Sequence, residues 1–130
     1  MGMNRYWTRP VWMGLAAVGG FLGVAWGAFA AHVMVDPAAK ELIKTAASYD
    51  FMHAMATFAS AGFMALGARR ARLAPAFFVA GIVLFSGSLI ALALGAPRWV
   101  GAITPFGGVS FLIGWAILAW AAFEIDRKAN

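Results

Sequence analysis

Four long apolar runs, separated by short connections that carry charges or prolines, restrict the fold of this chain more than any other feature. The runs cover about residues 11–34, 46–67, 73–96 and 105–125. A helix needs about 20 apolar residues to cross the roughly 30 Å hydrocarbon core of a bilayer. Backbone polar groups in lipid must pair with each other, which favours helices. We predict an all-α integral membrane four-helix bundle, forming a single transmembrane domain over residues 1–130.

The amino-acid composition supports this class. Hydrophobic residues make up 63% of the chain and charged residues 12%, whereas soluble domains contain about 25% charged residues. The chain has no cysteine, which excludes disulfides, thiolate nucleophiles, iron–sulfur clusters and cysteine zinc sites. We expect a protein surrounded by membrane lipids, with no nucleic-acid partner.

The first apolar run has some features of a signal peptide. It follows Arg5 and Arg9 and contains the A-x-A-like sequence Ala28-Phe29-Ala30. However, it is longer than the roughly 7 to 15 apolar residues of a signal peptide. We therefore interpret it as a retained membrane span.

Small residues repeat at four-residue spacing in the first and third runs. This spacing places them on one face of each helix, where a neighbouring helix can approach closely. We expect helix packing at Gly19, Gly23 and Gly27 in the first run, and at Gly87 and Gly95 in the third.

Two connections carry helix-start signals. Asp36-Pro37 combines an N-cap residue with a proline at the first helical position, and Thr104-Pro105 does the same before the fourth run. Residues 40–44 mix three charged residues with two apolar ones, which predicts a short amphipathic surface helix between spans one and two. Residues 38–61 contain no glycine or proline, so the sequence leaves open whether this helix continues into the second span.

The distribution of Lys and Arg predicts the orientation. The two termini and the second connection carry seven of these residues and the other side carries three, so the positive-inside rule places both termini in the cytoplasm. The seven are Arg5, Arg9, Arg69, Arg70, Arg72, Arg127 and Lys128, and the three are Lys40, Lys44 and Arg98. We expect Arg69, Arg70 and Arg72 to contact anionic lipid headgroups.

This topology gathers the unusual polar side chains on the outer half of the bundle. Asp50 and His53 are three residues apart and share one face of the second helix. Ionisable groups at membrane depth usually face the bundle interior and have a partner. The candidate polar cluster consists of His32, Tyr49, Asp50, His53, Ser86, Ser88 and Thr104.

Several chemistries are open to this cluster. His32, His53 and Asp50 have the ligand types of a metal-binding facial triad, two histidines can ligate haem, and a serine near His53 would suit hydrolysis. Metal sites in helix bundles draw on several Glu and His residues from facing helices, which the predicted spans do not supply. Polar groups in lipid need partners whatever the function. We therefore favour an interhelical hydrogen-bond network, with no catalytic residue, metal or cofactor.

Four segments in a fixed order resemble a known family. They are residues 27–32 (GAFAAH), 45–49 with 53–54, 85–89 (FSGSL), and 104–108 (TPFGG) with 111–115. They resemble the YgdD family of small membrane proteins, which includes vertebrate transmembrane protein 256 and carries the label domain of unknown function (DUF423). The resemblance covers about residues 14–120. The family usually has glycine where this chain has Ala30, and glutamine where it has Asp50.

The resemblance implies a four-helix membrane protein with no established activity. We expect a non-enzymatic structural or accessory component of the bacterial inner membrane. Such a component would pack with lipid, with itself as a homo-oligomer, or with a larger membrane complex. The alternative is a small carrier or channel for a lipid or small molecule that uses the outer polar cluster.

Overall fold

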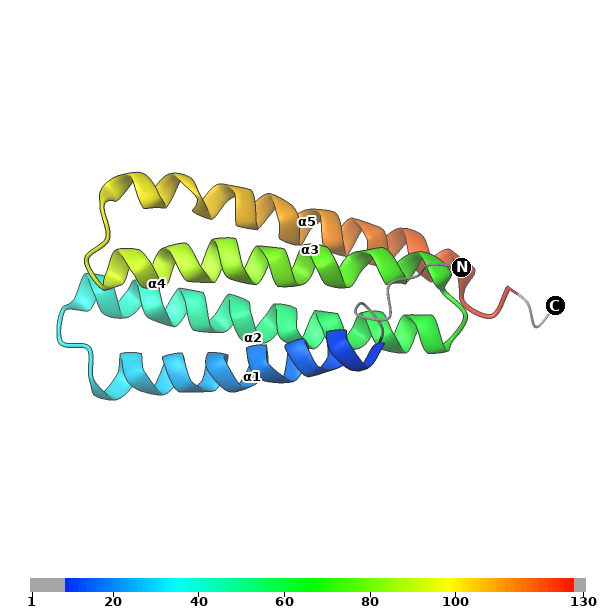
Figure 1. Ribbon diagram of the computed structural model, residues 1–130, viewed down its shortest axis with the longest axis horizontal. Coiled ribbons are helices and arrows are strands. Elements are labelled where there is room, and N and C mark those ends of the chain that lie inside the picture. The colour runs from blue at the N-terminus through cyan, green and yellow to red at the C-terminus, as the bar shows by residue number, and fades with distance from the viewer. Residues whose placement is uncertain (1–8, 128–130) are drawn as a thin grey trace.

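The computed structural model describes residues 9–127, and over that range every regular element is a helix (Figure 1). The helices form four long rods. These are α1 (Arg9–His32), α2 (Pro37–Ala65), a third rod made of α3 (Ala74–Gly81), η3 (Ile82–Ser86) and α4 (Gly87–Ala93), and α5 (Thr104–Ala121). Short 3₁₀ turns flank them: η2 (Arg69–Leu73), η4 (Arg98–Ala102) and η5 (Ala122–Glu124).

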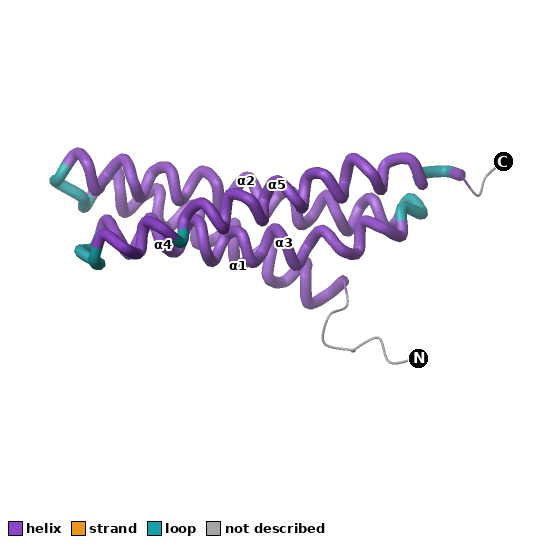
Figure 2. The backbone as a smooth tube through the Cα atoms, turned by 90° about the horizontal axis from the view of Figure 1, so that it is seen from above, coloured by secondary structure: helices purple, strands orange, loops and turns teal. Residues whose placement is uncertain are grey.

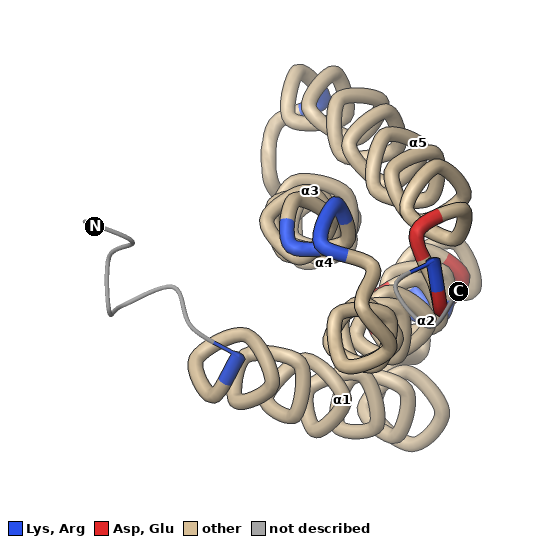
Figure 3. The backbone as a smooth tube through the Cα atoms, turned by 90° about the vertical axis from the view of Figure 1, so that its right-hand side faces the viewer, with Lys and Arg blue, Asp and Glu red and all other residues tan. Residues whose placement is uncertain are grey.

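The four rods run lengthwise beside one another (Figures 1 and 2). The α1–α2 and α4–α5 connections lie at one end, whereas the start of α1, the α2–α3 connection and the end of α5 lie at the other. Viewed along the rods, α1 and α5 lie apart, and α2 and the third rod lie between them (Figure 3). Helix α1 packs mainly on α2, and the third rod packs on both α2 and α5.

Three stretches of the described chain are long and apolar enough to cross a membrane: Arg9–His32, Arg69–Ala93 and Arg98–Glu124. Helix α2 has 29 residues, or about 43 Å at 1.5 Å per residue, so its length also suffices. It is less apolar because its first turns carry Lys40, Glu41 and Lys44.

The sequence left open whether the predicted surface helix continues into the second span, and the structure shows that it does. Helix α2 runs unbroken from Pro37 to Ala65, and its N-terminus is capped by Asp36, whose Oδ2 accepts a hydrogen bond from the Ala39 N–H at 2.9 Å. Ile43 in the second turn is fully buried. The first turns therefore pack against the rest of the protein, and with no glycine or proline to interrupt the helix they continue into the second span.

Glycines allow α5 to approach the third rod closely. A Cβ atom on Gly114 would lie 2.5 Å from Phe78 Cε1, and one on Gly107 would lie 2.7 Å from Phe85 Cβ and 2.8 Å from Phe85 Cα. Such distances leave no room for a methyl group. Phe78 and Phe111 also belong to the buried apolar core that joins these elements.

The predicted packing glycines divide into two groups. Gly19 and Gly23 face α2, where added Cβ atoms would lie 3.2 Å from Asp50 Oδ1 and from Phe51 Cβ respectively. Gly27 lies farther from α2, because a Cβ there would be 3.9 Å from Ala47 Cβ.

The predicted packing role of Gly87 and Gly95 is wrong. A Cβ on either residue would meet nothing within 4 Å. Gly95 instead ends the α4 helix with a φ of +103°, a conformation that glycine adopts without strain, and the next N–H, of Ala96, donates to Ala91 O at 2.9 Å. The four-residue spacing there reflects a helix-ending glycine rather than a contact face.

We expect Gly107→Ala to lower the free energy of unfolding by about 1–3 kcal/mol, because the added methyl group would overpack against the Phe85 backbone. Gly108→Ala is the matched control, since a Cβ on the next residue of the same helix would meet nothing within 4 Å. It should be neutral, or stabilising by up to about 1 kcal/mol through helix propensity. Denaturant unfolding in detergent, followed by circular dichroism, measures both. Equal losses in the two variants would contradict this packing.

Candidate functional site

His53 lies at the centre of the polar side chains that the fold brings together. Its Nδ1 lies 2.7 Å from Tyr49 O one turn earlier in α2, and Trp115 Nε1 of α5 donates to its Nε2 at 3.0 Å. An indole N–H can only donate, so Nε2 must accept, and the imidazole is the neutral tautomer with its proton on Nδ1. Both ring nitrogens are therefore hydrogen-bonded within the protein.

Aromatic rings enclose this histidine. The Phe111 ring stacks on it with a centroid separation of 3.5 Å and an interplanar angle of 9°, and Phe78 and Trp115 approach from other sides. Tyr49, whose side chain is 39% exposed, packs on Phe85 at 4.6 Å between ring centroids. The rings come from α2, the third rod and α5, so the histidine is held where these three rods meet.

Two serines of the predicted cluster connect neighbouring rods through their hydroxyl groups. Ser86 Oγ donates to Ala46 O of α2 at 2.7 Å, and Ser88 Oγ lies 2.5 Å from Thr104 Oγ1 at the start of α5. Residues two apart in a helix face different directions, so these serines bond to different neighbours. The turn that positions Ser86 is the five-residue π-helical segment η3, and π-helical turns often occur at functional sites.

Sequence reasoning missed a third hydroxyl bridge. Ser110 Oγ of α5 donates to Phe77 O of α3 at 2.7 Å. The available signal was its register, because Ser110 lies three residues after Gly107 and four before Gly114, on the small-residue face of α5 that packs against the third rod.

Asp50 is the exception among the buried polar residues. Its side chain is 4% exposed, and its Oδ1 has no hydrogen-bond partner. Helix α1 covers the carboxyl group through Gly19, on which a Cβ would lie 3.2 Å from Oδ1. A buried polar atom without a partner costs free energy, so this carboxyl group is either a source of strain or a group with a role of its own.

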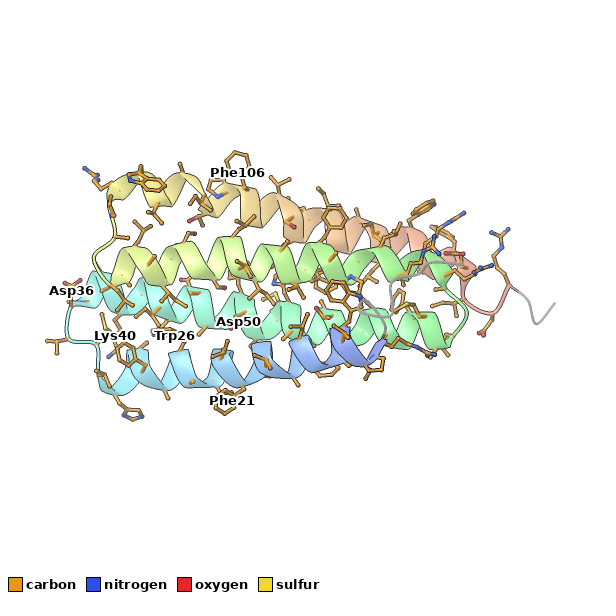
Figure 4. All side chains as sticks on the ribbon, viewed as in Figure 1. Phe21, Trp26, Asp36, Lys40, Asp50 and Phe106 are labelled. Carbon is orange, nitrogen blue, oxygen red and sulfur yellow. The ribbon has the colours of Figure 1, made fainter. Side chains whose placement is uncertain are left out.

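The cluster lies deeper along α2 than predicted. Asp50 and His53 lie 13 and 16 residues after Pro37, or about 20 and 24 Å along the helix, rather than at its outer start. Figure 4 shows Asp50 about midway along α2. The difference arises because α2 begins at Pro37, so the residues predicted to form a surface helix occupy its first turns.

The prediction that His32 belongs to the cluster is wrong. It is the last residue of α1 and is exposed. The α1 face that packs on α2 contains Gly19 and Gly23, and His32 is rotated away from that four-residue row. The geometry therefore does not assemble a triad of His32, His53 and Asp50, and residues 9–127 contain no other group of three such side chains that could hold a metal.

The three arginines before α3 are not equivalent. Arg70 contacts the end of α5 through both its backbone and its side chain. Its backbone N–H donates a hydrogen bond to Glu124 Oε1 at 2.8 Å, and its Nε lies 3.6 Å from the same oxygen. Its guanidinium group lies over the Trp120 ring, 4.0 Å from the ring centroid. Arg69 and Arg72 are exposed, so they keep their side chains free to contact lipid headgroups.

We expect Asp50→Asn to raise the free energy of unfolding, because a neutral amide of the same shape costs less to bury without a partner than an ionised carboxylate does. Asp36→Asn is the matched control. Asn caps helices as well as Asp does, so this variant should be neutral. Denaturant unfolding in detergent measures both. A loss of stability in Asp50→Asn alone would mean that the carboxyl group has a stabilising partner.

Comparisons with known proteins identify the family. Residues 26–108 match the family described as "Protein of unknown function (DUF423)". The chain is 41% identical over 124 residues to a UPF0382 membrane protein of Haemophilus influenzae, which covers 93% of this chain and 95% of the relative. It is 42% identical over 120 residues to the UPF0382 inner membrane protein YgdD of Escherichia coli K12, covering 87% and 89%. The third relative, the UPF0382 membrane protein YwdK of Bacillus subtilis, is 37% identical over 116 residues, covering 85% and 94%.

No solved structure matches the chain. The family resemblance predicted from the four sequence segments is confirmed by these matches. The chain therefore belongs to the DUF423 family of proteins of unknown function, and the UPF0382 membrane proteins are its relatives.

Proposed function

We propose that this protein is a non-enzymatic structural or accessory component of the bacterial inner membrane. In this proposal its four rods form a membrane-spanning bundle that packs with lipid, with a second copy, or with a larger complex. The name of the E. coli relative, an inner membrane protein, supports the location. The 29-residue length of α2 supports a fourth span beside the three apolar stretches.

The observation that carries the proposal is how the buried polar side chains are used. Ser86, Ser88 and Ser110 bond to neighbouring rods, and both nitrogens of His53 are occupied. A hydrolytic or metal centre needs a nitrogen or hydroxyl group that a substrate or ion can reach. Side chains that bond to each other across helix contacts favour a role in holding the helices together.

The outer faces of the rods are suited to lipid or to a partner helix. Phe21 of α1 and Phe106 of α5 point outward on opposite sides of the molecule (Figure 4), and the Phe21 side chain is 73% exposed. Exposed apolar surface of this extent on a membrane protein is the natural contact surface for acyl chains or another membrane helix.

Charge placement supports an orientation with both termini in the cytoplasm. Cationic residues lie at the start of α1, just before α3 and at the end of α5, which share one end of the molecule (Figure 3). Arg5 and Lys128, which contributed to the count from the sequence, lie outside the described residues. The positive-inside rule assigns this end to the cytoplasm.

A second candidate is a carrier or channel for a lipid or small molecule. The observation that favours it is the unpartnered Oδ1 of Asp50, which a ligand could satisfy. The hydrogen-bonded nitrogens of His53 and the hydrogen-bonded serines favour the structural role instead. They leave few polar groups in the cluster that could bind a ligand without breaking a bond between helices.

We expect a reporter fused after Asn130 to be cytoplasmic and one inserted between Val35 and Asp36 to be periplasmic. The end of α5 and the α1–α2 connection lie at opposite ends of the rods, so the two fusions serve as each other's controls. Activity of paired alkaline-phosphatase and fluorescent-protein fusions measures the location. A periplasmic signal at position 130 would overturn the proposed orientation.

The structural role predicts coupling between His53 and Trp115. In a double-mutant cycle with His53→Ala and Trp115→Phe, we expect a coupling of about 0.6 kcal/mol, and at most about 1.7, in the free energy of unfolding. Trp120→Phe is the control partner, because Trp120 contacts Arg70, and its coupling to His53→Ala should be close to zero.

Native mass spectrometry of the same variants, purified in mild detergent, distinguishes the two candidate functions. If His53→Ala released a co-purified small molecule and left stability unchanged, the polar cluster would be a ligand site and the structural role would fail.

A further inference from the structure

An open apolar groove of about 870 Å³ runs along the outside of α2, between α1 and α5. Helix α1 packs mainly on α2, and Figure 3 shows α1 and α5 apart, with α2 between them. On the α1 side the groove is lined by Gly23 and Gly27, which have no side chains to fill it. On the α2 side it is lined by the flexible side chains of Met52 and Met55, and on the α5 side by Trp115. Apart from Trp115, the residues of the polar site described above do not line it.

The groove has the direction and length of a lipid chain. Its α2 lining extends from Lys44 to Ala59, which is 15 residues or about 22 Å along the helix axis. A second hollow of about 590 Å³ shares Val24, Phe51 and Met55 with it and follows α1 back to Ala16. In a helix that crosses the bilayer, such a groove lies parallel to the acyl chains.

One end of the groove is charged. Lys44 is the one charged residue among the described residues that line it, and Ser48 lies one turn farther along the same wall. The Lys44 Nζ lies 3.4 Å from Glu41 Oε1, and both side chains are mostly exposed. Exposed pairs of this kind add little stability, and an ammonium group has three donors, so Lys44 can bind a phosphate oxygen as well.

We propose that this groove binds a membrane phospholipid, with an acyl chain lying on α2 between α1 and α5 and the phosphate group at Lys44 and Ser48. The inference rests on the membrane placement proposed above. Because surrounding lipid is as apolar as the groove, burial alone does not favour occupancy, and selectivity comes from close packing and from the headgroup. A positive charge at one end of an apolar groove complements the charge distribution of an anionic phospholipid.

Two pairs of matched variants test the proposal. Gly27→Leu places a large side chain at the groove, and its Cβ would meet only Ala47 Cβ, at 3.9 Å. Gly87→Leu adds the same side chain at an exposed α4 position, where a Cβ would meet nothing within 4 Å. Lys44→Gln removes the charge at the groove, and Lys40→Gln removes one from the preceding turn, outside the groove lining.

The measurement is native mass spectrometry of the full chain in mild detergent, after incubation with palmitoyl-oleoyl phosphatidylglycerol or with diacylglycerol of the same chains. We expect the wild type to retain phosphatidylglycerol, Lys44→Gln to bind it about fivefold more weakly, and Gly27→Leu to lose both lipids. Diacylglycerol should bind more weakly than phosphatidylglycerol and be unaffected by Lys44→Gln. Gly87→Leu and Lys40→Gln should match the wild type.

Several results would overturn the proposal. One is that Gly27→Leu retains as much lipid as the wild type does. Another is that Lys44→Gln and Lys40→Gln lose phosphatidylglycerol equally. A third is a wild-type dimer that contains no lipid and that Gly27→Leu dissociates, because a second copy would then be the occupant of the groove. Extraction of membranes with alkaline carbonate tests the placement separately. Release of the protein into the soluble fraction would refute the membrane proposal, whereas a membrane-bound protein with an empty groove would refute this inference alone.

Discussion

The contact between aromatic rings of the third rod and glycines of α5 determines how the other parts of the structure meet. Gly107 and Gly114 leave room for Phe85 and Phe78, and Gly81 receives Phe111 in return. The two rods can then approach closely enough for Ser110 to reach a carbonyl oxygen of α3. The same approach places Phe111 on the face of His53 and brings the Trp115 indole within hydrogen-bonding distance. Side-chain volume, rather than hydrophobic attraction, controls these contacts, as expected for helices surrounded by lipid.

Buried polar side chains in the described part of the chain have hydrogen-bond partners, and Asp50 Oδ1 is the exception. His53 and the three serines have partners on other rods or on their own helix, because an unpaired polar group away from water is costly. Asp50 Oδ1 has none, and α1 covers it through Gly19.

Helix α1 differs from the other rods because it has essentially one neighbour. Its packing on α2 leaves its far side exposed and leaves the groove between α1 and α5 open. The proposed accessory role and the proposed phospholipid site both depend on this arrangement. A partner helix would use the outer faces of α1 and α5, whereas an acyl chain would use the space between them. His53 connects the polar cluster to the groove, because it accepts a hydrogen bond from Trp115, which forms one wall of the groove.

The sequence by itself determined the helical class, the approximate ends of the rods and the family, because apolar run length, proline and capping residues act locally. The Asp36 cap followed from this chemistry. The predicted cap at Thr104 is wrong: α5 begins at Thr104, Ile103 precedes it without a side-chain cap, and the Thr104 hydroxyl lies against Ser88 instead. Only the tertiary structure decided that α2 is continuous, that His32 lies outside the cluster, that Ser110 lies inside it, and that Gly95 ends a helix. These features depend on how each helix is rotated about its own axis. In a chain whose helices are apolar on every side, the hydrophobic pattern carries little information about that rotation, and the fit of neighbouring side chains determines it.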